Sequence, residues 1–236
     1  MANLRERLAD NPYPGRGIVL GRSDRGHWVQ VYWIMGRSVN SRNRVFVRDQ
    51  DIVRTQAADP SKVEDPSLII YNAMRRLGPL CLVTNGAQTD GLYDGMAQGL
   101  TFTEALAKWQ HEPDAPNFTP RISGALDLSS GEVWLSLIKA SPFTPSACEH
   151  HFYRYTHMDP GTGYTVTTYS GDGNPLPSFS GPPYLTPLRG DAGTIAATFW
   201  DALNAENRIS LAVREVDPDT TEDRTELINQ YQALSR

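Results

Sequence analysis

The stretch ISGALDLSSGEVWLSLI, residues 122–138, decides the fold class of this chain. It contains two apolar runs, 122–128 and 133–138, which are separated by Ser129-Ser130-Gly131. Runs that are rich in β-branched and aromatic residues and bounded by Gly or Asp are typical of strands. A short Gly-containing segment between two such runs is typical of a hairpin turn. The stretch therefore predicts a β-hairpin.

Runs of the same kind recur on both sides of this hairpin. We expect further strands near residues 18–20, 28–35, 45–47, 68–73, 80–83, 151–156, 164–169 and 209–215. Helices are predicted at only three places, 101–110, 193–203 and 221–234. The first of them opens with Thr101 and Glu104, which can cap each other's backbone donors. Strands in runs, with helices grouped between them, favour an α+β fold with layers of sheet and helix.

Composition bounds the class of protein. The chain has 236 residues, of which 39% are hydrophobic, so we expect a single domain spanning 1–236. Its formal net charge of −5 offers no basic field to phosphate backbones, which argues against general nucleic-acid binding. No apolar stretch approaches the roughly 20 residues that span a bilayer, and the polar N-terminus does not resemble a signal peptide. We therefore expect a cytoplasmic protein without a membrane partner.

Three features bear on loops and metals. Residues 170–190 contain four Gly and five Pro, which predicts a long loop. Cys81 and Cys148 are far apart and lack Cys-x-x-Cys spacing, so neither a disulfide framework nor a zinc site is predicted. The run Glu149-His150-His151, with His157, lacks the spacing that places metal ligands on one helical face. We predict no metal site.

An arginine-rich segment, GRSVNSRNR at 36–44, follows a predicted strand and contains Arg37, Ser38, Arg42 and Arg44. Guanidinium groups offer planar forks of donors that suit a phosphate or a carboxylate. The segment therefore predicts an anion site, with a solvated polar loop as the alternative. Three more arginines near the first strand are candidates for the same pocket: Arg16, Arg22 and Arg25.

A burst of polar residues, TNGAQTD at 84–90, directly follows an apolar run. Active-site groups often lie at such strand ends. Asn85 can supply an amide donor and Gly86 an unobstructed backbone N–H, a pair that can stabilise charge developing on an oxygen atom. The alternative is an Asn-Gly hairpin turn, although Thr89, Asp90 and their neighbours add more polarity than a turn requires. We predict that this segment handles a small anionic substrate.

Two further segments carry groups that can move protons. Tyr71 lies near the end of a predicted strand, where its hydroxyl can donate or accept; half-buried packing is the alternative. The segment QHEPD at 110–114 places His111, Glu112 and Asp114 together as candidate acids or bases. Its alternative is an ordinary acidic helix end.

In their order along the chain, these segments resemble the archaeal-type IMP cyclohydrolase family. The resemblance extends from the first predicted strand almost to the C-terminus. It is carried by GIVLGR at 17–22, GRSVNSR at 36–42, YN at 71–72, TNGAQTD at 84–90, TPRI at 119–122, TY at 168–169 and LAVRE at 211–215.

This resemblance implies a four-layer αββα sandwich like that of the N-terminal-nucleophile hydrolases, without their autoprocessing. Removal of Met1 would expose Ala2, which has no nucleophilic side chain. The resemblance also implies a homo-oligomer.

The reaction implied by the resemblance closes 5-formamidoimidazole-4-carboxamide ribotide to IMP with loss of water, a step of purine biosynthesis that needs no cofactor. Its small-molecule partner is a purine nucleotide. Such a step requires phosphate anchoring, orientation of the amide against the formyl group, charge stabilisation and proton transfer. By resemblance, the catalytic residues are Arg42, Tyr71, Asn85 and Glu112. Substrate contacts are assigned, also by resemblance, to Arg22, Arg37, Ser38, Gly86, Thr89, Asp90 and Arg121.

The chain departs from the family pattern in a longer N-terminal lead-in, in the 170–190 segment and in the predicted C-terminal helix. The spacing from Glu112 to Arg121 is also longer by about one residue, which leaves His111 and Asp114 as alternatives for the acid or base. Two other functions stay open. One is a nucleotide-binding regulatory module without turnover; the other is a related amide cyclase or hydrolase that acts on another heterocycle.

Overall fold

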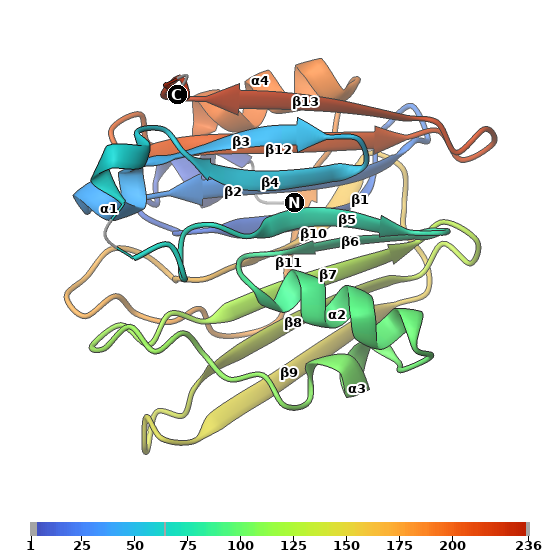
Figure 1. Cartoon of the computed structure of the whole chain (residues 1–236). Coiled ribbons are helices and arrows are strands. Elements are labelled where there is room, and N and C mark those ends of the chain that lie inside the picture. The colour runs from blue at the N-terminus through green and yellow to red at the C-terminus, as the bar shows by residue number, and fades with distance from the viewer. Residues whose placement is uncertain (1–3, 64, 235–236) are drawn as a thin grey trace.

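The computed structural model describes residues 4–63 and 65–234 and contains two antiparallel β-sheets with a few short helices (Figure 1). One sheet has six strands in the order β11-β10-β1-β2-β12-β13, and the other has seven in the order β3-β4-β5-β6-β7-β8-β9. The expected α+β class is confirmed. No helix within the described ranges is long and apolar enough to cross a bilayer.

The six-stranded sheet consists of β1 (Gly17–Arg22), β2 (Trp28–Met35), β10 (Thr162–Thr167), β11 (Tyr184–Pro187), β12 (Arg208–Val216) and β13 (Asp223–Asn229). The seven-stranded sheet consists of β3 (Arg44–Asp49), β4 (Ile52–Ala57), β5 (Asn72–Leu77), β6 (Leu80–Thr84), β7 (Arg121–Asp127), β8 (Val133–Ala140) and β9 (Cys148–Tyr155). The helical segments are η1 (Arg5–Ala9), α1 (Val39–Arg42), η2 (Pro60–Lys62), α2 (Gln88–Ala97), α3 (Phe102–Leu106) and α4 (Ala192–Ala202).

The predicted hairpin forms from β7 and β8, with Leu126 opposite Val133. Its turn closes through a hydrogen bond of 2.8 Å from the Gly131 N–H to the Asp127 carbonyl. Gly131 has a φ of +73°, a conformation that glycine adopts without steric cost. The turn residue that marked the hairpin in the sequence is therefore the one the backbone requires.

Three apolar cores hold these elements together. The largest contains side chains from both sheets, among them Ile18 and Tyr32 from one and Val83 and Leu135 from the other. A second core joins the six-stranded sheet to α4 and η1, and a third joins the seven-stranded sheet to α2 and α3. Figure 1 shows α4 beside β12 and β13, and α2 and α3 against the other sheet. Burial of this apolar surface is the main force that holds the sheets and helices together.

The helix predicted at 221–234 is wrong, because the chain there forms β13, which pairs with β12 from Val216↔Asp223 to Ser210↔Asn229. Leu227 packs on the core between the sheets, whereas Ile228 packs on the core beneath α4. Adjacent side chains thus point to opposite faces, which is the period of a strand. The charged residues of the segment lie on an edge strand, where solvent reaches them.

Helix α2 was not predicted, and it begins within the polar segment 84–90. The first turn of α2 has no side-chain cap, and the helix contains two glycines, which lower helix propensity. Packing explains both glycines. A Cβ at Gly91 would lie 2.8 Å from the Trp109 ring, and a Cβ at Gly95 would lie 2.9 Å from Ala105. Tertiary contact overrides propensity here, and the hairpin-turn alternative for Asn85-Gly86 is excluded.

Other boundaries differ for local reasons. The strand expected at 68–73 starts only at Asn72, because the Ile69 and Ile70 amides both donate to the Pro66 carbonyl in a turn. The helix that opens at Thr101 has the predicted capping box but ends at Leu106. The loop predicted at 170–190 includes the short edge strand β11, which pairs with β10. Strand β4 and helix α1 were also not predicted.

We predict that Gly21→Ala destabilises the fold, because a Cβ at Gly21 would lie 2.2 Å from the Thr162 carbonyl oxygen and 2.4 Å from the Gly163 Cα in β10. Overpacking of this kind costs about 1–3 kcal/mol. The free energy of unfolding from urea titration measures the loss. Gly171→Ala is the control, because the nearest atom to its Cβ is 3.7 Å away. Equal stability of the two variants would contradict the prediction.

Candidate active site

A cavity of about 300 Å³ opens where the N-terminal end of β1 meets the C-terminal ends of β2 and β10. Its wall comes from segments far apart in the sequence. The lining residues are Tyr13, Gly15, Arg16, Met35, Arg37, Ser38, Ser41, Arg44, Asp114, Asn117, Thr119, Tyr169 and Leu176. Three arginines in this wall make the cavity suitable for an anion.

Two larger grooves, of about 630 and 390 Å³, flank the C-terminal segment around Leu234. Arg54 is the arginine that lines the first, and Arg42 lines the second. We take the smaller cavity as the candidate active site because it combines three arginines with a buried polar network. The network starts at Arg16.

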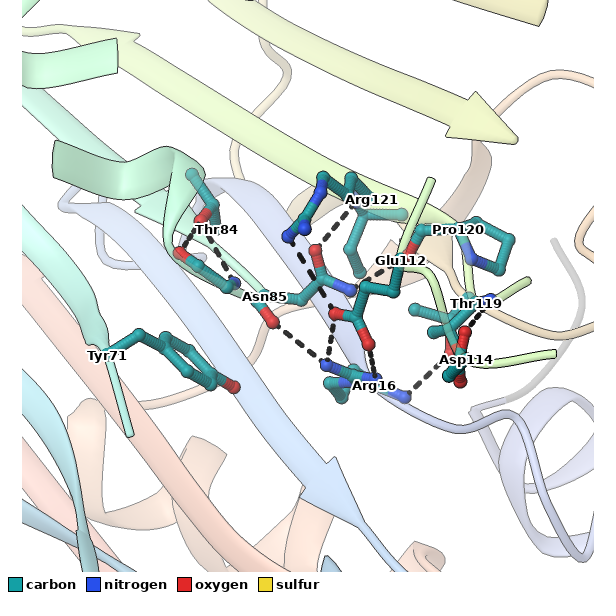
Figure 2. Close-up of polar contacts among 12 residues, drawn as sticks. Arg16, Tyr71, Thr84, Asn85, Glu112, Asp114, Thr119, Pro120 and Arg121 are labelled. Atoms are coloured by element: carbon teal, nitrogen blue, oxygen red, sulfur yellow. Dashed lines mark hydrogen bonds and ion pairs between the residues drawn. The ribbon is translucent and has the colours of Figure 1, made fainter. Parts of the chain in front are cut away.

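A buried ion pair between Arg16 and Glu112 forms the centre of this network (Figure 2). The Arg16 Nη1 and Nη2 atoms donate to Glu112 Oε1 and Oε2 at 2.8 and 3.0 Å, which is a bidentate pair. Glu112 is only 2% exposed, and Arg121 Nη1 lies 3.9 Å from its Oε1. The carboxylate of Glu112 is therefore flanked by two guanidinium groups.

Burial affects the two arginines differently. Burial lowers the pKa of Arg16, but the Glu112 carboxylate, together with Tyr71 and Tyr32, outweighs this effect and leaves that pKa well above its ordinary value. Burial also lowers the pKa of Arg121, and Glu112, which is farther from Arg121 than from Arg16, offsets this effect only partly. Arginine remains protonated in either setting. Arg16 is thus the arginine that is most tightly bound to Glu112.

Asn85 lies against this ion pair at the end of β6. Its backbone carbonyl accepts from Arg16 Nη1 at 2.9 Å. Its side chain is fully engaged: Nδ2 donates to the Pro120 carbonyl at 2.9 Å, and Oδ1 accepts from the Ile122 amide at 2.9 Å and from Gln88 Nε2 at 2.7 Å. These bonds tie the β6–α2 junction to the start of β7.

The rest of the segment 84–90 divides between two surroundings. A Cβ at Gly86 would lie 2.7 Å from Arg121 Nη1, so a glycine is needed for the guanidinium to approach. Thr89 is buried, with its hydroxyl 2.6 Å from that of Thr84. Asp90 instead accepts from Asn72 and pairs with Arg75 at 2.7 Å. Asp90 thus belongs to a separate surface pair.

Tyr71 points its hydroxyl toward Arg16 (Figure 2) and lies 2.6 Å, Oη to Oη, from Tyr32. Both rings are buried. Burial raises the pKa of Tyr32 well above its ordinary value, and Tyr71 adds to this effect. Tyr32 is therefore a neutral phenol that shares one hydrogen bond with the Tyr71 oxygen.

Arg44 is the buried cation of the cavity wall, with only 3% of its surface exposed. Its Nε donates to the Ser41 carbonyl at 2.8 Å, and none of the carboxylates whose side chains the structure describes forms an ion pair with it. Burial lowers the pKa of Arg44, and Tyr71 partly opposes this. A buried charge without a counter-ion is costly, so this site favours an anion.

The other predicted arginines occupy different positions. Arg37 lines the cavity but pairs with Asp172, donates to the Gly173 carbonyl at 3.3 Å and stacks on the Tyr13 ring. Ser38 lines the cavity and caps α1. Arg22 lies at the opposite end of β1, about 17 Å from Gly17 at strand spacing, and contacts the Gly26 carbonyl. The structure therefore does not bring Arg22 to the cavity.

Several residues of the cavity wall carry little signal in the sequence. Arg16 was only a weak candidate, and Arg44 was not separated from Arg42 two residues earlier. Tyr13 and Tyr169 were not singled out as site residues. Position next to a strand end was the one local signal, since Arg16 precedes β1 and Tyr169 follows β10.

The two sheets and the arginine-lined cavity define an α+β protein with a small cationic site. A family model described as IMP cyclohydrolase-like protein matches residues 13–221. The chain belongs to this family. It is 31% identical over 162 residues to the IMP cyclohydrolase of Methanopyrus kandleri, covering 66% of this chain and 75% of that protein. It is 29% identical over 163 residues to that of Methanosphaera stadtmanae, covering 66% and 73%.

We predict that Glu112→Ala lowers the free energy of unfolding by about 3–5 kcal/mol, because it leaves Arg16 buried without its counter-ion. Urea unfolding measures the change. Glu132→Ala is the matched control: it breaks an exposed ion pair with Arg154, for which about 0–1 kcal/mol is expected. A loss at Glu112 no larger than the loss at Glu132 would contradict the central role of this pair.

Proposed function

We propose that this protein is an IMP cyclohydrolase, which closes 5-formamidoimidazole-4-carboxamide ribotide to IMP with loss of water. The observation that carries the proposal is the family match over 13–221, which includes every residue of the cavity wall. A cavity of about 300 Å³ is at the lower end of the range that small-molecule sites occupy, roughly 300–1,000 Å³. A nucleoside monophosphate is an anion of suitable size.

We further propose the four-layer αββα arrangement of the N-terminal-nucleophile hydrolases for this fold. Its support is the placement of the three apolar cores, one shared by the two sheets and one beneath the helices on each sheet. The proposal extends to a single domain, to a cytoplasmic location and to a homo-oligomer. These last three rest on composition and on the family resemblance.

Arg44 is assigned to the phosphate of the ribotide. It is the buried arginine of the wall that has no carboxylate partner among the described residues, and Ser38 and Ser41 place hydroxyl groups in the same wall. A phosphate there gains charge-assisted hydrogen bonds and supplies the missing counter-ion. Arg37 adds a second guanidinium if it exchanges Asp172 for the ligand.

Ring closure then takes place beside Arg16 and Tyr71. The carboxamide nitrogen attacks the formyl carbon, and negative charge develops on the formyl oxygen. Arg16, held rigidly by Glu112, is a preorganised cation for that charge. Asn85 and Gly86 fix the position of Arg16 and of Arg121. Glu112, the acid or base that the family resemblance implies, orients Arg16 in this structure through their bidentate contact.

The proposal predicts that the purified protein, without added metal, interconverts the formamido ribotide and IMP. Ultraviolet absorbance follows the reaction, because ring closure converts an imidazole into a purine. Absence of turnover in either direction would contradict the proposal. If IMP raised the melting temperature of a protein without turnover, a nucleotide-binding module would be the better description.

Arg44→Met is predicted to lower kcat/KM roughly 10- to 100-fold, the loss expected for one charge-assisted hydrogen bond to phosphate. Arg42→Met is the paired variant, because Arg42 is two residues away and lines a different groove. Steady-state kinetics on both variants decides which arginine serves the substrate. A larger loss with Arg42→Met would assign the role to Arg42 and not to Arg44.

A further inference from the structure

Tyr169, Thr119 and Asp114 form a hydrogen-bonded chain, and all three line the cavity. The Tyr169 Oη and Thr119 Oγ1 atoms are 2.5 Å apart. The Thr119 hydroxyl also donates to Asp114 Oδ2, and the Thr119 amide donates to Asp114 Oδ1 at 2.7 Å. None of the three has a role in the function proposed above.

The direction of the protons follows from these contacts. Because Thr119 gives its hydroxyl hydrogen to the Asp114 carboxylate, its oxygen accepts the hydrogen of Tyr169. Burial raises the pKa of Tyr169 to about 12, although Arg16 acts in the opposite sense. The Tyr169 hydroxyl is therefore protonated at neutral pH, and a group that gives it a proton sends another along the chain to Asp114.

The backbone holds this chain in place. Phe118 has a φ of +44°, a left-handed conformation that costs a non-glycine residue about 1–2 kcal/mol. It persists because the Asn117 and Phe118 amides both donate to the Asp114 carbonyl, at 3.1 and 3.3 Å. Strain that is maintained by surrounding contacts is a feature of functional sites.

The chain is also fixed to the central ion pair. The Glu112 amide donates to the Thr119 carbonyl at 2.9 Å. The Arg16 amide donates to Thr168 Oγ1 at 3.0 Å, directly before Tyr169. The hydroxyl of Tyr169 and the guanidinium of Arg16 therefore face one cavity from fixed positions.

We propose that Tyr169, Thr119 and Asp114 are a proton relay for the ring closure, with Tyr169 as the member that touches the substrate. The inference rests on the proposed cyclohydrolase function. Thr119 and Asp114 act through Tyr169 and are positioning and relay residues. Hydroxyl–carboxylate chains of this kind carry protons between a reacting group and a base.

As the new C–N bond forms, the carboxamide nitrogen gives one proton to Tyr169, whose own proton passes to Thr119 while that of Thr119 passes to Asp114. The same route returns a proton to the former formyl oxygen, giving a hydroxyl group. In a second cycle the proton from the formamido nitrogen reaches this hydroxyl as the C–O bond breaks and the electron pair of that N–H bond forms the C=N bond of the ring. The oxygen leaves as water, and Asp114 is again a carboxylate.

Thr119→Val and Thr119→Ser form the test, because valine matches threonine in shape but lacks the hydroxyl, whereas serine retains it. We expect Thr119→Val to lower kcat about 100-fold, the lower end of general acid–base contributions, with little change in KM. Thr119→Ser should retain most of kcat. In mixtures of H₂O and D₂O, the wild type should show a curved dependence of kcat on deuterium fraction, which the valine variant loses.

Each outcome decides one question. If the wild type turns over and both variants retain its kcat, the relay is overturned while the cyclohydrolase function stands. A rise in KM alone would show that Thr119 only binds substrate and would also overturn the relay. A wild type without turnover would overturn the proposed function itself. If the melting temperature shows that Thr119→Val does not fold, Tyr169→Phe removes the first hydroxyl of the chain and is held to the same expectation for kcat.

Discussion

Arg16 and Glu112 form a bidentate ion pair inside the protein, at the point where the two sheets and the 110–120 loop meet. Removing two charges from water costs several kcal/mol per ion, so such a pair persists only where further hydrogen bonds satisfy both partners. The Asn85 carbonyl accepts one such bond from Arg16, and the Arg121 guanidinium, 3.9 Å from Glu112 Oε1, places a second positive charge beside the carboxylate. These groups must all be in place together for Arg16 to hold its position in the cavity wall.

The pair also explains why residues from distant parts of the chain belong to one site. Arg16 precedes β1, Asn85 directly follows β6, and Glu112 lies in the loop before β7. Arg44 differs from them, because it is buried beside the same cavity with no carboxylate partner in the described part of the chain. The protein thus satisfies one guanidinium internally and leaves another for an anion.

Local sequence patterns predicted much of the sheet structure and little of the cavity. The hairpin at 122–138 was predictable because its apolar runs and its turn glycine are adjacent in sequence. Strand β13 was not predictable, because its charged edge-strand pattern resembles that of a solvated helix. Helix α2 was not predictable either, because its glycines are explained only by packing. The polar segment 84–90 was recognised at a strand end, but its contact with Arg16 was not predicted. Contacts such as Tyr169 with Thr119 join separate elements, and no local pattern encodes them.

The contact of Arg37 with Asp172 has a further consequence for the cavity. The guanidinium of Arg37 is one fork of donors, which already binds the Asp172 carboxylate and the Gly173 carbonyl of the 170–176 segment. Leu176 of the same segment forms part of the cavity wall. An anion that recruits Arg37 must compete with this built-in carboxylate. Binding of such an anion is therefore coupled to release of the 170–176 segment from Arg37. Because the ion pair between Arg37 and Asp172 is exposed, the salt concentration of the surrounding solution shifts this coupled equilibrium.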